Sequence, residues 1–103
     1  MVHRYFRLEE VLRDLEVDRE FVRVLEVEEI IHPKLSSEGE TVLSAEDVER
    51  VRLARVLMRE LEVNLPGVEV VLHLREELLS LQRQFGEILE QLVQELRKEL
   101  SRR

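Results

Sequence analysis

The sequence contains no cysteine, which excludes disulfides, thiolate nucleophiles and cysteine-based zinc sites. Its histidines, His3, His32 and His73, never lie three or four residues apart, so we expect no metal site. The three glycines form no phosphate-binding loop, and the Gly-x-Ser-x-Gly, Walker and His-Glu-x-x-His motifs are missing. These absences predict a protein that is not an enzyme and has no catalytic residue and no cofactor.

A long hydrophobic run is also missing. The longest apolar-rich stretch, residues 65–74, is interrupted by Pro66, Gly67 and Glu69 and is too short to span a bilayer. Residues 1–5 lack the apolar core of a secretion signal. We therefore expect a cytoplasmic protein that makes no use of a membrane.

The charge balance of the 103 residues is acidic, with a formal net charge of −7. Hydrophobic residues make up 44% and charged residues 38%, a composition that predicts one small folded domain. A nucleic-acid-binding domain usually carries a basic face. The negative field instead favours a basic protein partner.

Hydrophobic periodicity predicts two short helices near the start of the chain. Four apolar residues share one helical face: Leu8, Val11, Leu12 and Leu15. The pattern breaks at Asp18, a suitable N-cap for a second helix that carries Phe21, Val22 and Leu25. Two short helices joined by about three residues form the helix-turn-helix arrangement.

Short strands are expected on either side of these helices. Residues 2–7 read as one strand, and Pro33 ends the segment that follows the second helix. Residues 34–43 read as a hairpin wing whose return strand is formed by residues 41–43.

A third helix is predicted from Ser44, its N-cap, to about Glu62. Five residues mark its buried stripe: Val48, Val51, Ala54, Met58 and Leu61. Asn64 or Leu65 then caps the next helix, with Pro66 at its first position.

The last helix is predicted to run from residue 68 to about residue 100, about 50 Å at 1.5 Å per residue. Seven residues form a heptad a/d seam: Val71, Leu74, Leu78, Leu81, Phe85, Ile88 and Leu92. The apolar stripe then shifts to Leu89, Val93, Leu96 and Leu100. The seam could be a homodimer interface, a groove for a partner helix or part of an intramolecular core. We favour the homodimer, because the rest of the chain is too small to cover the stripe.

This order of parts resembles the head of MerR-type regulators and, more closely, the chaperone-modulator CbpM family. The resemblance rests on residues 5–11, on residues 30–33 and above all on residues 61–72, which match the family's break and "PG-hydrophobic" helix start. It implies a mainly α fold, with a MerR-like winged helix-turn-helix head (1–64), a small β wing and a long coiled-coil helix (65–103).

The resemblance also implies a function. A protein of this family binds the J domain of a DnaJ/CbpA-type co-chaperone. It regulates the work of that co-chaperone with Hsp70 (DnaK) by occlusion, without chemistry.

Residues 64–70 also resemble the DNA-binding heat-shock repressors of the MerR superfamily, which makes a transcriptional regulator the alternative. Such readers carry a motif of the form LRYYE in the second helix, where this chain has Phe21-Val22-Arg23-Val24-Leu25-Glu26 without the aromatic pair. Residues 18–29 hold five acidic and two basic residues, a balance of −3. Because such a helix repels phosphates, nucleic acid is not the expected partner.

Two sets of charged residues are candidate contact sites. An acidic face formed by Glu20, Glu26, Glu28 and Glu29 could dock a basic surface of the co-chaperone, although a solvated acidic face is the alternative. Arg52, Arg55 and Arg59 could form a basic contact stripe, although intrahelical ion pairs are the more ordinary role of such residues.

Overall fold

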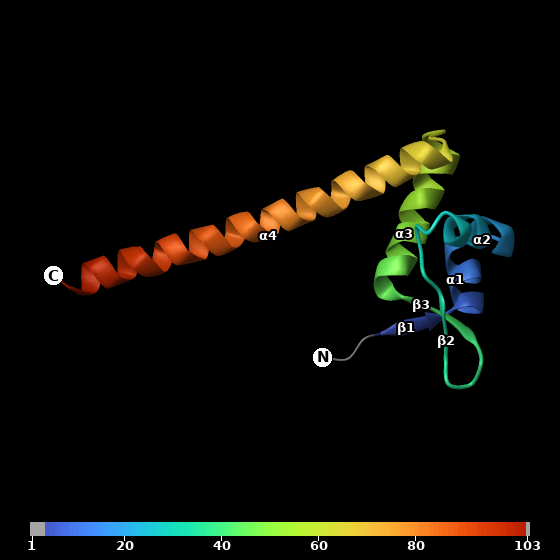
Figure 1. Ribbon diagram of the computed structural model, residues 1–103, viewed down its shortest axis with the longest axis horizontal. Helices are drawn as coiled ribbons and strands as arrows, with labels where there is room; N and C mark the ends of the chain where they lie inside the picture. The colour runs from blue at the N-terminus through green and yellow to red at the C-terminus, as the bar shows by residue number, and fades with distance from the viewer. Residues whose placement is uncertain (1–3, 103) are drawn as a thin grey trace. The chain divides into compact units, whose positions relative to one another are not determined.

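The computed structural model describes residues 4–102 and is mainly helical. Its elements are β1 (Tyr5–Arg7), α1 (Leu8–Leu15), α2 (Arg19–Val27), β2 (Lys34–Leu35), β3 (Thr41–Ser44), α3 (Ala45–Arg55), the π-helical turn η1 (Val56–Glu60) and α4 (Leu65–Ser101). The strands form one antiparallel sheet in the order β1-β3-β2. The expected winged helix-turn-helix followed by a long helix is confirmed (Figure 1).

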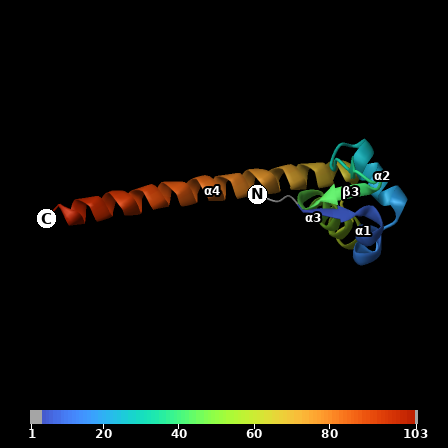
Figure 2. The same cartoon turned by 90° about the horizontal axis from the view of Figure 1, so that it is seen from below.

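Contacts group the chain into two units, one ending at Glu69 and one beginning at Val70. We call the first unit the head. Its α1 and α3 pack against the small sheet (Figure 2). Fully buried side chains from several elements form its core: Leu25, Ile31, Leu43, Val51 and Val68. No helix of residues 4–102 is long and apolar enough to cross a membrane.

The helix-turn-helix forms as the sequence predicts. Three residues, 16–18, separate α1 from α2. The Asp18 carboxylate accepts a hydrogen bond of 2.8 Å from the backbone N–H of Phe21, so Asp18 caps α2.

Both short helices end in a Schellman motif, which the sequence analysis did not predict. At the end of α2, Ile30 N–H donates to the carbonyl of Leu25, and Glu29 N–H donates to that of Glu26. Glu29 takes a left-handed φ of 58°, and Glu16 at the end of α1 takes a φ of 55°. Glycine is the usual residue at this position, so each glutamate adopts a strained conformation.

The wing is a short hairpin of β2 and β3, in which Leu35 pairs with Thr41. Its loop is closed by Ser36, whose N–H donates to the carbonyl of Glu40 and whose hydroxyl accepts from the N–H of Glu38 and of Glu40. The predicted N-terminal strand is confirmed for residues 5–7, which pair with residues 42–44. Val2 and His3 lie outside the described residues.

The start of α3 joins the strands to the helices. Ser44 caps α3 by accepting a hydrogen bond from Asp47 N–H at 3.1 Å. Asp47 is buried, and its carboxylate accepts from the backbone N–H of His32 at 2.9 Å and from Arg50 Nη1 at 3.1 Å. One carboxylate therefore holds the segment before the wing against α3.

The third helix does not continue regularly to Glu62 as predicted. It changes at Val56 into η1, where Leu61 N–H bonds to the carbonyl of Val56 five residues earlier. Val63 N–H then bonds to the carbonyl of Leu57, and Glu62 is left-handed with a φ of 55°. This ending resembles a Schellman motif widened by one residue, and it leaves Leu61 exposed rather than buried.

Asn64 starts α4 by accepting a hydrogen bond of 2.9 Å from Gly67 N–H. The helix begins at Leu65, so Pro66 occupies its second position and not the predicted first. A Cβ at Gly67 would lie 2.7 Å from Val63 Cγ1, which explains the need for glycine there. The predicted uninterrupted course of α4 past Gly86 is confirmed.

Candidate functional site

The exposed surface of α2 is the candidate site of the head. All four residues of the predicted acidic face, Glu20, Glu26, Glu28 and Glu29, are exposed. The structure does not gather them on one side, because Glu20 and Glu26 line grooves on opposite flanks of the helix. Their role in binding stays a prediction.

The first groove lies between α2 and the wing and has a volume of about 490 Å³. Its charged lining residues are Arg19, Arg23, Lys34 and Glu26. Three cations thus face one carboxylate on this flank. The local charge is positive, although residues 18–29 together carry a net negative charge.

The second groove lies between α2 and η1 and has a volume of about 250 Å³. Asp18, Glu20 and Arg59 lie on its lining, together with the apolar side chains of Phe21, Val24 and Met58. Two carboxylates against one arginine leave the groove acidic, and an acidic rim around an apolar floor suits an amphipathic helix that carries lysine or arginine next to its apolar face.

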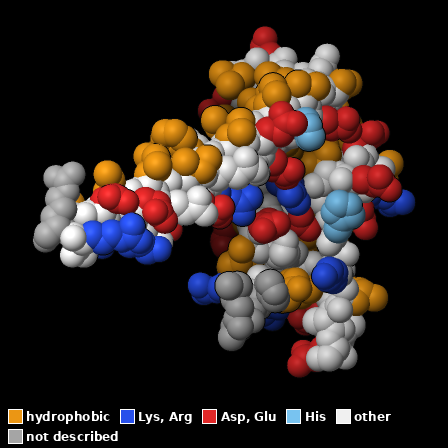
Figure 3. All heavy atoms as spheres, turned by 60° about the vertical axis from the view of Figure 1, so that its left-hand side comes forward, with side chains coloured by type: hydrophobic (Ala, Val, Ile, Leu, Met, Phe, Trp, Pro, Cys, Tyr) orange, Lys and Arg blue, Asp and Glu red, His pale blue; other side chains and the backbone are white. Residues whose placement is uncertain are grey.

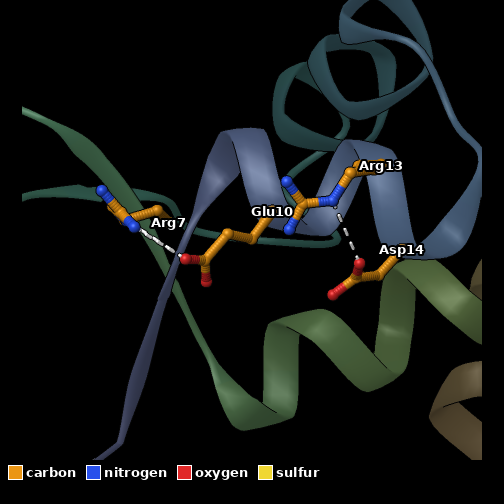
Figure 4. Close-up of polar contacts among 4 residues, drawn as sticks. All are labelled: Arg7, Glu10, Arg13 and Asp14. Carbon is orange, nitrogen blue, oxygen red and sulfur yellow. Dashed lines mark hydrogen bonds and ion pairs between the residues drawn. The ribbon is translucent and has the colours of Figure 1, made fainter.

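Ion pairs neutralise much of the positive charge near α1 and α2. Arg7 pairs with Glu10 at 2.9 Å, and Arg13 with Asp14 at 3.5 Å (Figure 4). The hydrogen bond to Glu10 raises the pKa of the Arg7 guanidinium above its ordinary value. Arg19 pairs with Glu9 on α1. These carboxylates compete with any phosphate that approaches the same arginines.

The three arginines of the predicted basic stripe all have partners within the head. Arg52 Nε donates to Glu49 Oε2 at 3.0 Å, and this pair raises the pKa of Arg52. Arg55 pairs with Glu16 at 3.4 Å. Arg59 donates to the carbonyl of Glu16 at 2.8 Å, and its guanidinium lies 5.8 Å from the centre of the Phe21 ring. A contact role for the stripe stays a prediction, but these interactions give it a structural role.

The second unit of the chain exposes the a/d seam. Its seven side chains are 39% to 62% exposed: Val71, Leu74, Leu78, Leu81, Phe85, Ile88 and Leu92. Hydrophobic side chains gather along the visible face of this helix (Figure 3). An apolar surface of this length on one helix is typical of an interface.

Two features of the head do not follow from the sequence pattern. The first is Asp47, whose buried carboxylate accepts a hydrogen bond from the N–H of His32, fifteen residues earlier. The π turn at Val56–Glu60 has no sequence signal that we can name. Within residues 4–102, no three histidine or acidic side chains group as metal ligands.

Comparison with known families supports the architecture. Residues 6–99 match the family described as MerR HTH family regulatory protein. No curated protein matches the chain. The family match extends from β1 almost to the end of α4, so it covers both the head and the long helix.

Proposed function

The chain belongs to the MerR helix-turn-helix family of regulatory proteins, and on that premise we propose that it is a chaperone modulator. Its target is the J domain of a DnaJ/CbpA-type co-chaperone. By covering that domain, the protein regulates the work of the co-chaperone with its Hsp70 (DnaK) and catalyses no reaction.

The observation that carries this proposal is the surface of α2, the helix that reads DNA in MerR-type proteins. On the flank that faces η1, the groove combines Asp18 and Glu20 with an apolar floor and a single arginine, Arg59. Arg19, which starts α2, is already paired with Glu9. This surface favours a basic, amphipathic protein helix over a phosphate backbone.

Binding at α2 would by itself block access of other proteins to the bound helix of the co-chaperone. A helix laid along α2 places the rest of a small partner domain over the head, so a second protein cannot reach the covered helix. Pairing of two chains through the a/d seam gives a homodimer with two such surfaces.

The proposal is tested by titrating the protein with the J domain of its host and measuring the heat of binding. We expect saturable binding that weakens as salt rises, together with reduced J-stimulated ATP hydrolysis by Hsp70. Absence of both effects contradicts the proposal.

A matched pair of variants locates the surface. Replacing Glu20, Glu26, Glu28 and Glu29 by glutamine should weaken binding about tenfold or more, since rim charges contribute modestly one by one. Replacing Glu77, Glu87, Glu95 and Glu99 on α4 by glutamine makes the same charge change and should leave binding within about twofold. Equal effects of the two sets would remove α2 from the interface.

DNA binding is the second candidate, and the groove between α2 and the wing favours it. Arg19, Arg23 and Lys34 converge there, on the elements that MerR-type readers apply to DNA. A gel shift on the upstream region of the protein's own operon at low salt tests it. A shift that is lost when Arg23 and Lys34 are replaced by glutamine would support this candidate, and no shift would remove it.

A further inference from the structure

The groove between α2 and the wing is positive, although the chain has a net charge of −7. Among its charged residues, Arg19 is already paired with Glu9, so Arg23 and Lys34 remain against Glu26. Two cations and one carboxylate leave the groove with an uncompensated charge of +1. This flank of α2 therefore suits a negatively charged ligand, whereas the flank that faces η1 suits a positive one.

Arg23 differs from the arginines around it. The other seven arginines between positions 7 and 59 each bond to a carboxylate or a backbone carbonyl: Arg7, Arg13, Arg19, Arg50, Arg52, Arg55 and Arg59. Among residues 4–102, no acidic side chain pairs with Arg23, although Glu20 and Glu26 lie three positions away on the same helix. Lys34 has no acidic partner in that range either, and its Nζ lies 5.9 Å from the centre of the Tyr5 ring. Both cations are thus available to a ligand.

The rest of the groove favours a protein segment over a phosphate backbone. Leu35 on β2 lines the groove and is 73% exposed, so an apolar contact lies beside the cations. Glu38 and Glu40 lie in the loop of the wing, where they repel a polyanion. A net charge of +1 is enough for one carboxylate, whereas a nucleic acid needs cations for several phosphates. The chemistry fits an acidic side chain that has an apolar neighbour.

We infer that the groove between α2 and the wing is the second half of the partner site, and that it binds an acidic side chain of the same J domain. The basic helix of that domain lies in the groove between α2 and η1. A segment that adjoins this helix crosses α2 and places its carboxylate between Arg23 and Lys34. Because the two grooves carry opposite charge, they accept the partner in one orientation only. The inference rests on the proposed function, and it assigns to the protein partner the cations that DNA binding would otherwise use.

Reversing the charge of the groove tests the inference by the sign of its effect. Replacing Arg23 and Lys34 by glutamate changes the charge by −2 at each position and by −4 in total. If the groove lies outside the interface, the more acidic protein should bind a basic partner as tightly as the wild type or more tightly. The inference instead predicts binding of the J domain about tenfold weaker or more in calorimetry, because the acidic side chain then faces two carboxylates.

A matched control makes the same charge change elsewhere. Arg83→Glu/Arg97→Glu alters two positions of α4 that lie outside the a/d seam, and it should bind the J domain at least as tightly as the wild type. Circular dichroism should show the same helix content for Arg23→Glu/Lys34→Glu as for the wild type, because both replaced side chains are exposed. If that variant unfolds, the milder Arg23→Gln should still weaken binding about threefold, and unchanged binding of Arg23→Gln would overturn the inference.

A charge reversal on the partner identifies the acidic side chain. Each acidic residue of the J domain is replaced in turn by arginine, and each variant is titrated with the wild type and with Arg23→Glu. One of these variants should bind the wild type about tenfold more weakly and should recover most of that loss with Arg23→Glu. If no acidic position shows such recovery, the inference is overturned.

The remaining outcomes separate the inference from the proposed function. A wild type that does not bind the J domain overturns both. A wild type that binds, together with an Arg23→Glu/Lys34→Glu variant that binds equally well, overturns the inference alone. A gel shift that this variant abolishes while its binding of the J domain is unchanged assigns the groove to DNA, and it likewise overturns the inference.

Discussion

The head and the second unit use apolar residues in opposite ways. In the head, Leu25, Leu43 and Val51 come from three different elements and are all completely buried. In α4, Leu78, Phe85 and Leu96 lie along one helix and remain more than half exposed. Side chains of a single helix cannot cover one another, whatever their composition. The head therefore buries its core within one chain, whereas the apolar face of α4 beyond Val70 stays exposed unless a partner covers it.

The largest expected effect comes from placing a charge in the seam. Leu78→Lys should raise the dissociation constant of the proposed dimer at least about a hundredfold. The new lysine would be buried in the interface without an acidic partner, and it would lose its hydration there. Sedimentation velocity measures the mass, and circular dichroism should show loss of helix while the head remains folded.

Ser80→Lys provides the matched control for this variant. It adds the same charge two residues away, on the polar side of the helix. We expect its mass to equal that of the wild type. Equal masses for the wild type and Leu78→Lys would mean that the seam is not the interface.

The second largest effect is expected from a cavity in the core of the head, and it should not depend on protein concentration. Leu25→Ala removes a side chain that is 0% exposed and should lower the free energy of unfolding by about 3 kcal/mol, as in other buried leucine sites. Urea denaturation should show this loss at every protein concentration. If the seam is the homodimer interface that we propose, Leu81→Ala should instead lose its effect on dilution, because its contacts then exist only in the pair. A concentration-dependent effect of Leu25→Ala would contradict the distinction between the two units.

The local signals in the sequence predicted much of both units. Asp18, Ser44 and Asn64 form the caps expected of them, since a cap depends on residues only three positions apart. The course of α4 was also predictable, because heptad spacing and the lack of a breaker are local properties. The same kind of pattern predicts the seam and the acidic face, and what they bind stays a prediction.

Features that depend on distant residues were not predictable. The bond from His32 to Asp47 joins a loop to a helix, and Arg59 reaches the carbonyl of Glu16 from η1. The division of α2 carboxylates between two grooves depends on where the wing and η1 pack. A hydrophobic pattern cannot encode such positions, because it records only which face of a helix is buried.

The buried carboxylate of Asp47 gives the third prediction. Asp47→Ala leaves the N–H of His32 and the guanidinium of Arg50 without this acceptor, and it should lower the free energy of unfolding by about 2 to 3 kcal/mol. Asp47→Asn keeps one acceptor oxygen and should cost about half as much. Thermal unfolding of the two variants measures the difference. Equal losses would show that packing at this position matters more than the hydrogen bonds.

The smallest effect concerns two neighbouring glutamates at the end of α2. Glu29 has a left-handed φ of 58°, whereas Glu28 has a φ of −83°. Glu29→Gly should raise the free energy of unfolding by about 0.5 to 1 kcal/mol, because it removes the strain of a side chain in that region. Glu28→Gly should lower it by about as much, through the added freedom of the unfolded chain.

Both substitutions remove one negative charge at the end of α2, so the loss of charge alone cannot give changes of opposite sign. Urea denaturation of the two variants at equal protein concentration measures both changes in the free energy of unfolding. The same variants also separate stability from binding. If the acidic face docks a basic helix, both variants should bind the J domain slightly more weakly than the wild type. This should hold even though one variant is more stable than the wild type and the other is less stable. Binding that instead follows stability would mean that the order of α2, and not its charge, controls the contact.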